Sequence, residues 1–409
     1  MKRDAILIFF ISWVFFLVGI NHPAAHNFDE FHYIPSAFQW LNLIPNQNWE
    51  HPPLAKLLIV PGLVLFGDTP LGWRFMSTLF GALTMAGFYV MATFFFDSET
   101  SKNHTTRRMA WVATILAITN QFVFVQARIA MLDTFMMAFL IWSLAFLIKA
   151  LDRNTYKPTW IQYSGMLIGL AIACKWFALI PWALGLGLQF IRAIQLKSKG
   201  RLSDIIFFWC ILPAFYYFAS FTPYLLIQKT PAHTFSELLT SMQMAMWDGQ
   251  KRVVTPHPYA SQLWDWITLR RPMWYAFNKE GLHSEYVRGV LLLGNPIIMW
   301  GGLWAVLIAS YDWVKNKSWS AFLVLSLYLS FTLCWLVIPR KIAFYYYYYP
   351  AAMALTLACA YVLQKANRSI QWVTLTATTV VFIWFYPILS ALKIPAEKFR
   401  QWMILDSWI

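Results

Sequence analysis

Two adjacent carboxylates, Asp29 and Glu30, begin the stretch Asp29-Glu30-Phe31-His32-Tyr33, directly after the first apolar run of the chain. Adjacent carboxylates just beyond a helix end repel each other and lose solvation beside a membrane, so at least one pKa should be perturbed. A carboxylate of that kind is a candidate general base. The alternative is a solvated acidic pair that caps the following helix, because acidic residues are favoured at helix starts.

The same segment offers further polar side chains. His51 and Lys56 flank Pro52-Pro53, which fixes the backbone between them. Together with Glu50, the carboxylates and histidines could supply metal ligands, yet their spacing fits no compact metal motif. We therefore expect no cofactor and no metal site, and Mg²⁺ or Mn²⁺ is the alternative that the ligand types favour.

Basic residues recur where apolar runs end. Arg128 and Asp133 lie five residues apart, so they either pair with each other or divide the work, Arg128 holding a phosphate and Asp133 orienting it. The planar fork of Arg suits phosphate oxygens. Lys175 interrupts a long apolar run, which makes it a functional candidate unless it only snorkels to the interface.

A run of five tyrosines, Tyr345 to Tyr349, follows Arg340 and Lys341. An aromatic belt at the membrane interface explains most of them. Five in succession exceed what a belt needs, so we expect some, Tyr345 among the candidates, to line an anionic headgroup site beside Arg340. With Arg74, these cations form a ring facing the acidic pair, which suggests a phosphate-bearing lipid, most naturally a polyprenyl-phosphate sugar.

The composition indicates what must position these residues. Of 409 residues, 59% are hydrophobic and only 12% are charged, against about 25% charged in soluble domains. A spanning helix needs about 20 apolar residues. We predict one all-α membrane domain, residues 1–409, with eleven spans, near 5–21, 72–96, 108–126, 129–150, 160–174, 176–194, 203–226, 289–311, 319–338, 342–363 and 370–390.

Half of the 32 Lys and Arg residues fall on one side if the N-terminus is cytoplasmic, as the positive-inside rule requires. The net charge of +14 is then largely topological, and a nucleic-acid partner is excluded. The segments 22–71 and 228–288 become long outer loops, so we expect the chemistry on the non-cytoplasmic face. The first span reads as an uncleaved anchor, and the four cysteines lie in apolar runs without redox or zinc chemistry.

Several motifs resemble one family in order along the chain. Phe28 to Tyr33 with His51 to Lys56, Arg128 to Asp133, Lys175-Trp176, His257 to Pro272 and Arg340 to Pro350 are similar to dolichyl-phosphate-mannose protein O-mannosyltransferases, glycosyltransferase family 39, of the GT-C type. The resemblance implies a polyprenyl- or dolichyl-phosphate sugar as donor and a secreted or membrane protein as acceptor. The segment 228–288 is too short for the MIR domain of eukaryotic members, so we expect a bacterial or archaeal plasma-membrane enzyme.

The resemblance also implies roles. Asp29 would take the proton of a Ser or Thr hydroxyl, and Glu30 would bind sugar hydroxyls or position the acceptor. Arg128, Lys175 and Arg340 would hold the lipid phosphate, His51 and Lys56 would shape the loop or contact the phosphate, and Tyr259 and Trp264 would form part of the acceptor path. Related GT-C enzymes act on lipid A or other glycolipids, so the identity of the acceptor stays open. The oligomeric state is open as well. A transporter would need broken helices in repeated halves, which the sequence does not contain.

Overall fold

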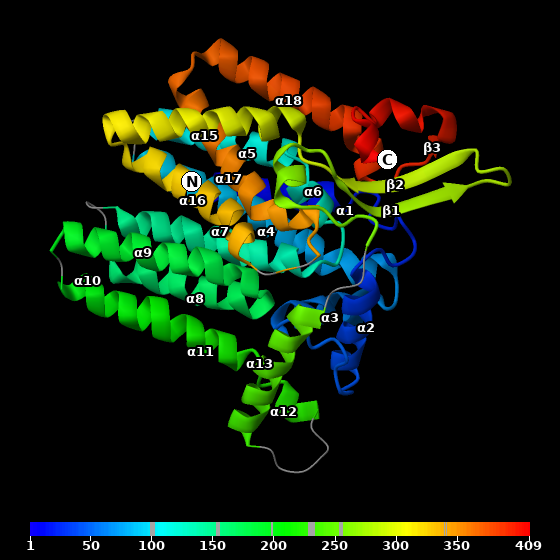
Figure 1. The fold of residues 1–409 in the computed structure, drawn as a ribbon, viewed down its shortest axis with the longest axis horizontal. Helices are drawn as coiled ribbons and strands as arrows, with labels where there is room; N and C mark the ends of the chain where they lie inside the picture. The colour runs from blue at the N-terminus through cyan, green and yellow to red at the C-terminus, as the bar shows by residue number, and fades with distance from the viewer. Residues whose placement is uncertain are drawn as a thin grey trace.

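The computed structural model describes residues 1–98, 103–152, 156–197, 199–227, 234–252, 257–338, 340 and 342–409. Long helices run side by side in one bundle, and the N-terminus lies at the end opposite the C-terminus (Figure 1). The bundle consists of α1 (Lys2–Leu17), α4 (Pro70–Asp97), α5 (Asn103–Thr119), α7 (Leu132–Leu151), α8 (Pro158–Cys174), α9 (Leu179–Gln195), α10 (Lys199–Asp204) continued by a π-helical segment (Ile205–Ile211) and α11 (Leu212–Ala219), α15 (Pro296–Asn316), α16 (Trp319–Val337), α17 (Tyr349–Lys365) and α18 (Arg368–Leu389).

Short elements gather at the end of the bundle that holds the C-terminus (Figure 1). They are α2 (Glu30–Leu41), α3 (Leu54–Phe66), α6 (Phe122–Gln126), α12 (Tyr224–Ile227), α13 (Phe235–Arg252), α14 (Leu263–Ile267), β1 (Met273–Glu280), β2 (Tyr286–Leu292), β3 (Ile394–Pro395) and the 3-10 helices Trp176–Ala178, Tyr345–Tyr348, Ala396–Trp402 and Asp406–Trp408. The strands form one antiparallel sheet in the order β1-β2-β3. The predicted all-α membrane fold class is confirmed, and the small sheet is an addition that the sequence did not predict.

Each of the eleven predicted spans contains a helix. Within the described ranges, seven helices are long and apolar enough to cross a membrane. The other four spans hold α1, α5, α8 and α17, which have 16 or 17 residues. The chain is therefore an integral multi-pass membrane protein, and the count of eleven crossings stays a prediction.

Three predicted spans begin or end elsewhere than expected. The span 289–311 starts as strand β2, and its helix begins only at Pro296, where the side chain of Asn295 accepts a hydrogen bond from the Ile297 amide. The span 342–363 becomes helical only at Tyr345, and its first four helical residues form a 3-10 helix. The span 108–126 is broken at Gln121, which has a φ of 80°. Apolarity predicts burial in the bilayer or the core, but local capping and backbone geometry decide where each helix starts.

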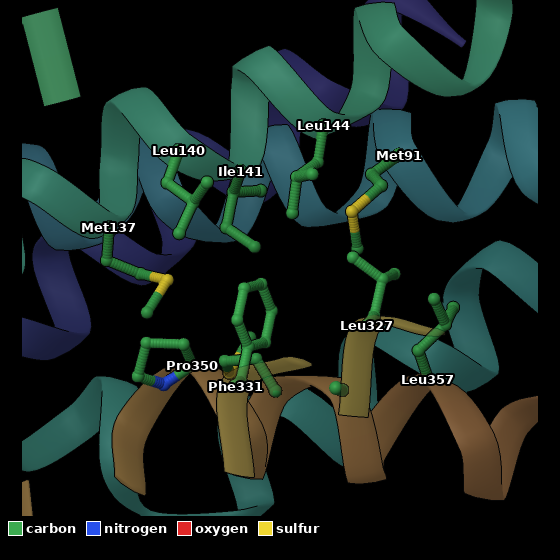
Figure 2. A pocket seen from close by; sticks show the side chains of 11 residues that line it. Met91, Met137, Leu140, Ile141, Leu144, Leu327, Phe331, Pro350 and Leu357 are labelled. Atoms are coloured by element: carbon green, nitrogen blue, oxygen red, sulfur yellow. The ribbon is translucent and has the colours of Figure 1, made fainter. Parts of the chain in front are cut away.

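Helix α7 lies at the centre of the bundle and is buried along nearly all of its length. Its side chains meet α4, α16 and α17 around a small apolar void of about 10 Å³ (Figure 2). Met137 of α7 and Pro350 of α17 close one end of this void. A space of this size holds at most one water and offers it no polar partner, so the bundle interior is packed and rigid next to the site described below.

Candidate functional site

Asp29 forms the N-terminal boundary of α2, on the side of the bundle where the short elements gather. The hydroxyl of Tyr33, one turn later in the same helix, donates a hydrogen bond of 3.1 Å to Asp29 Oδ2. Phe28, directly before Asp29, has a φ of 49°, a backbone conformation that residues other than glycine rarely adopt. Its ring contacts those of Phe344 and Tyr346, and these contacts hold the strained residue in place.

Burial of the carboxyl group raises the pKa of Asp29 above its ordinary value. The positive charge of Lys175 and the hydrogen bond from Tyr33 oppose this rise because both favour the ionised form. A carboxylate with a raised pKa is a stronger base than an exposed one. The expectation of a perturbed carboxylate in the acidic pair is met at Asp29.

Glu30 points the other way, into the protein, and is fully buried. Its oxygens accept hydrogen bonds from Arg74 Nε and Nη2, both at 2.8 Å, and from two backbone amides, those of Asn27 and Ala130, both at 2.9 Å. Arg74 uses its remaining N–H groups on the carbonyls of Ile20, Pro23 and Ala25. These bonds fix the loop before Asp29 to α4 and to the start of α7.

The Glu30–Arg74 geometry corrects two expectations. All four lone-pair positions of the Glu30 carboxylate are occupied by donors of the protein, so none is free for a sugar or an acceptor. Arg74 has no free N–H for a phosphate, so it does not belong to a cationic ring around the acidic pair. Both residues position Asp29 instead.

Asp133 pairs with Lys175 and not with Arg128. The Lys175 ammonium contacts both carboxylate oxygens, and both side chains are buried. Lys175 lies in the break between α8 and the following 3-10 helix, where its backbone is extended. That break turns the side chain inward, so it does not snorkel to the membrane surface.

Arg128 Nη1 donates to the carbonyls of Phe16 and Val18 at the C-terminal end of α1, and its guanidinium lies 5.0 Å from the Phe124 ring. A cation at a helix C-terminus satisfies unpaired carbonyls and the helix dipole. The structure thus places Arg128 at the end of α1 and not among the cavity-lining residues described next. Its expected role of holding the donor phosphate stays a prediction.

A cavity of about 290 Å³ lies beside these groups. Four expected site residues line it, namely His51, Asp133, Lys175 and Arg340. It is completed by Trp176, Phe177, Leu179, Ile180, Trp247, Gln250, Lys251, Trp335, Ile338, Tyr347 and Pro350. Asp29 is not among the lining residues. It is connected to them through Tyr33, which donates to Asp29 and whose ring lies 6.4 Å from that of His51.

Two buried N–H groups at this cavity have no hydrogen-bond partner among the described residues, Arg340 Nε and Trp335 Nε1. Buried donors are rarely left unpaired, and a donor without a partner in the protein indicates a place for a ligand or a water molecule. The lining combines cationic and polar side chains with apolar ones, and a lipid with an anionic headgroup needs both kinds of contact.

Burial, together with the nearby charges of Lys175, Lys56 and Arg340, holds the pKa of His51 well below its ordinary value, so its imidazole is neutral at pH 7. Lys56 is fully buried, and its ammonium donates to the backbone carbonyls of Asn48 and His51 and to Asn48 Oδ1. Lys56 therefore shapes the loop that presents His51, and all three of its protons are used. Of the two roles expected for it, only the structural one fits.

The helix type of the tyrosine run decides which of its rings face the core and which face the cavity. In a 3-10 helix, residues three apart lie on the same face, and the rings of Tyr345 and Tyr348 accordingly stack. Tyr345 faces the core, where its hydroxyl accepts a hydrogen bond from the Gly294 amide. Tyr347 faces the cavity, and its ring lies 5.1 Å from Lys175 Nζ and 4.9 Å from Arg340 Cζ. Tyrosines of the run do face inward as predicted, but the one that lines the cavity beside Arg340 is Tyr347 and not Tyr345.

The acceptor-path residues lie apart from this cavity. Tyr259 is half-buried beside His257, whose ring contacts Phe28, and Trp264 on α14 is exposed. Their roles stay predictions. Lys341 lies outside the described residues.

Helix α13 supplies cavity residues that the sequence did not single out. Trp247, Gln250 and Lys251 come from its C-terminal part. Gln250 Nε2 donates to the Glu50 carbonyl at 2.8 Å, which ties α13 to the first outer loop. The only available signal was the amphipathic pattern within the segment 228–288.

The residues do not fit a metal centre. Among the described residues, no three His, Cys, Asp or Glu side chains group closely enough to share an ion. Both Asp133 oxygens are already engaged by Lys175, which supplies the positive charge that a metal would bring.

A buried carboxylate and a cavity with charged and apolar lining lie at one end of a helical membrane bundle, an arrangement that fits a membrane-embedded glycosyltransferase. Two family models match the chain: dolichyl-phosphate-mannose-protein mannosyltransferase over residues 50–219, and the C-terminal four TMM region of protein-O-mannosyltransferase over residues 234–408. Together they match more than half of its residues. The chain belongs to the protein O-mannosyltransferase family.

Individual sequence relatives support this family membership. The polyprenol-phosphate-mannose–protein mannosyltransferase of Mycolicibacterium smegmatis is 25% identical, covering 93% of this chain and 87% of the relative. The enzyme of the same name from Corynebacterium glutamicum is also 25% identical, with 93% and 88% covered.

Solved structures share the fold. The Saccharomyces cerevisiae protein O-mannosyltransferase Pmt1–Pmt2 complex bound to the sugar donor matches with a TM-score of 0.81 at 14% identity, over 99% of this chain and 93% of that one. ArnT from Cupriavidus metallidurans bound to undecaprenyl phosphate matches with a TM-score of 0.64 at 14% identity, over 93% and 63%.

Proposed function

We propose that this protein transfers mannose, or a similar hexose, from a polyprenyl-phosphate sugar to Ser and Thr hydroxyls of proteins. Family membership and the activity for which the relatives are named support this reaction. The observation that carries it is the position of Asp29, a buried carboxylate with a raised pKa, bonded to Tyr33 beside a cavity lined by Lys175 and Arg340.

In the proposed reaction, Asp29 accepts the proton of the acceptor hydroxyl while that oxygen attacks the anomeric carbon. The bond from that carbon to the phosphate oxygen breaks, and the configuration inverts. General-base catalysis of this kind contributes about 10²–10⁴-fold. The acceptor becomes a glycoside and the polyprenyl phosphate leaves with the electron pair.

The leaving phosphate needs stabilisation more than it needs a proton. Arg340, with its unpaired Nε, and Lys175 are the proposed partners, because fixed cations in a desolvated site stabilise developing charge. Since these cations supply the charge, we propose that transfer needs no divalent metal. Neutral His51 is then available to bond a sugar hydroxyl.

We further propose that the site faces the exterior of a bacterial or archaeal plasma membrane. The distribution of Lys and Arg supports a cytoplasmic N-terminus, and the site lies at the opposite end of the bundle from that terminus.

The test uses purified protein in nanodiscs with radiolabelled polyprenyl-phosphate mannose and a Ser/Thr peptide, with and without EDTA. We expect label in the peptide fraction, unchanged by EDTA. Asp29→Asn should abolish it while the protein keeps its Tm, and Glu397→Gln, at an exposed position, serves as the matched control. Label in a glycolipid instead, after incubation with lipid A, would replace the protein acceptor by a lipid one. Full transfer by Asp29→Asn would remove Asp29 as the base.

A further inference from the structure

Strand β1 is the free edge of the three-stranded sheet. The order β1-β2-β3 leaves one side of β1 without a neighbouring strand. Among the described residues, no backbone group of 276–279 forms a hydrogen bond outside the β1–β2 ladder. A row of unpaired N–H and C=O groups is a template for an added strand.

This edge begins at the catalytic loop. The register of β1 against β2 shifts between Trp274 and Ala276, which leaves Tyr275 as the extra residue of a bulge. Bulges redirect side chains and are frequent beside active sites. The Tyr275 ring lies 5.7 Å from that of Phe28, the residue before Asp29, and its hydroxyl accepts a hydrogen bond of 3.0 Å from Gln126.

From that point the strand runs outward into solvent. Trp274 and Tyr275 are buried, whereas Phe277, Asn278 and Lys279 are exposed. The hairpin projects beyond the helices at the end of the bundle that holds the site (Figure 1). Three residues of strand cover about 10 Å, so the accessible edge starts beside Asp29 and ends in the surrounding water.

We propose that β1 is the docking edge for the acceptor polypeptide, which adds to the sheet as an extended strand and brings its Ser or Thr hydroxyl to Asp29. Strand addition binds through main-chain hydrogen bonds, with little demand on side chains. It selects an extended, unfolded segment and tolerates many flanking sequences. The proposal rests on the proposed transfer to protein hydroxyls.

The first experiment is an N-methyl scan of a peptide acceptor. Each backbone N–H on one side of the Ser is methylated in turn, and kcat/KM for transfer is measured. Because alternate N–H groups of a strand face the same neighbour, we expect methylation at every second position to lower kcat/KM by about fivefold to tenfold, the worth of one hydrogen bond. The positions between should change it less than about twofold. A uniform or patternless response overturns the proposal.

The second experiment assigns the edge. Asn278→Cys on β1 is trapped as a disulfide with a Cys-containing acceptor peptide, and Lys398→Cys, exposed on the neighbouring 3-10 helix, is the matched control. We expect the trapped species with Asn278→Cys only, and less of it when excess unmodified peptide is present during the oxidation, because that peptide competes for the edge before the disulfide forms. Equal trapping at both positions, or none at Asn278→Cys while the unmodified peptide is mannosylated, overturns docking at β1. Absence of mannosylation of the unmodified peptide would instead refute the proposed function.

Discussion

Lys175 Nζ lies 2.9 Å from Oδ1 and 2.8 Å from Oδ2 of Asp133, and the solvent reaches almost none of either side chain. The pair joins the break after α8 to the first turn of α7. Its ammonium also faces the rings of Tyr346 and Tyr347 at 4.9 and 5.1 Å. One cation thus connects two helices, the tyrosine run and the cavity.

The pair makes separable contributions to stability and to activity. Lys175→Met and Asp133→Leu alone should each lower the free energy of unfolding by about 3–5 kcal/mol, because each leaves a buried charge without its partner. The double variant should recover most of that loss. Thermal unfolding in detergent and the transfer assay measure the two effects. We expect no transfer from any of the three variants, and activity in the double variant would make the pair purely structural.

The second prediction concerns Glu30 and Arg74. Glu30→Gln leaves the Arg74 guanidinium buried without a counter-charge and should cost about 3–5 kcal/mol. Because Glu30 does not reach the cavity, KM for the lipid donor should stay within twofold, while kcat falls as Asp29 loses its fixed position. Exposed Glu397→Gln is the control in the same kinetic assay. A selective rise in donor KM would show that Glu30 contacts the substrate after all.

The pH profile tests the contact between Tyr33 and Asp29. A base works when ionised, so activity rises as pH increases through the pKa of Asp29. The Tyr33 hydrogen bond lowers that pKa, so Tyr33→Phe should raise it and move the acid limb of kcat/KM to higher pH. A bond of 0.5–1.5 kcal/mol corresponds to about half a pH unit to one unit. An unmoved acid limb, equal to that of the control Tyr163→Phe on α8, contradicts the assignment.

The tyrosine run supplies its own matched pair. Tyr347 contacts Lys175 and Arg340 at the cavity, and cation–π contacts are worth about 0.5–2 kcal/mol each. Because both contacts are lost, Tyr347→Leu should raise KM for the lipid donor by at least about fivefold. Tyr345→Leu removes an equally buried ring from the core, so it should lower Tm and leave the donor KM unchanged. The reverse outcome would restore Tyr345 as the substrate contact.

Much of the site could be predicted from the sequence because its parts are local. The motif around Asp29 indicated a carboxylate with a perturbed pKa, and the interruption of the apolar run at Lys175 indicated a charge with a specific partner. Arg340 and His51 also line the cavity as expected. The tyrosine run indicated an inward-facing aromatic, but the sequence contains no signal for its 3-10 geometry.

By itself, the sequence determined that this is a multi-pass membrane protein with its chemistry at one set of helix ends, since apolar length and charge placement are properties of contiguous segments. Only the tertiary structure decided which partner each charge takes. Glu30 and Arg74 meet across 44 residues, and Asp133 meets Lys175 across 42 and not Arg128 across five. Spacing within one element sets the direction of a side chain, whereas the packing of distant elements sets what it faces.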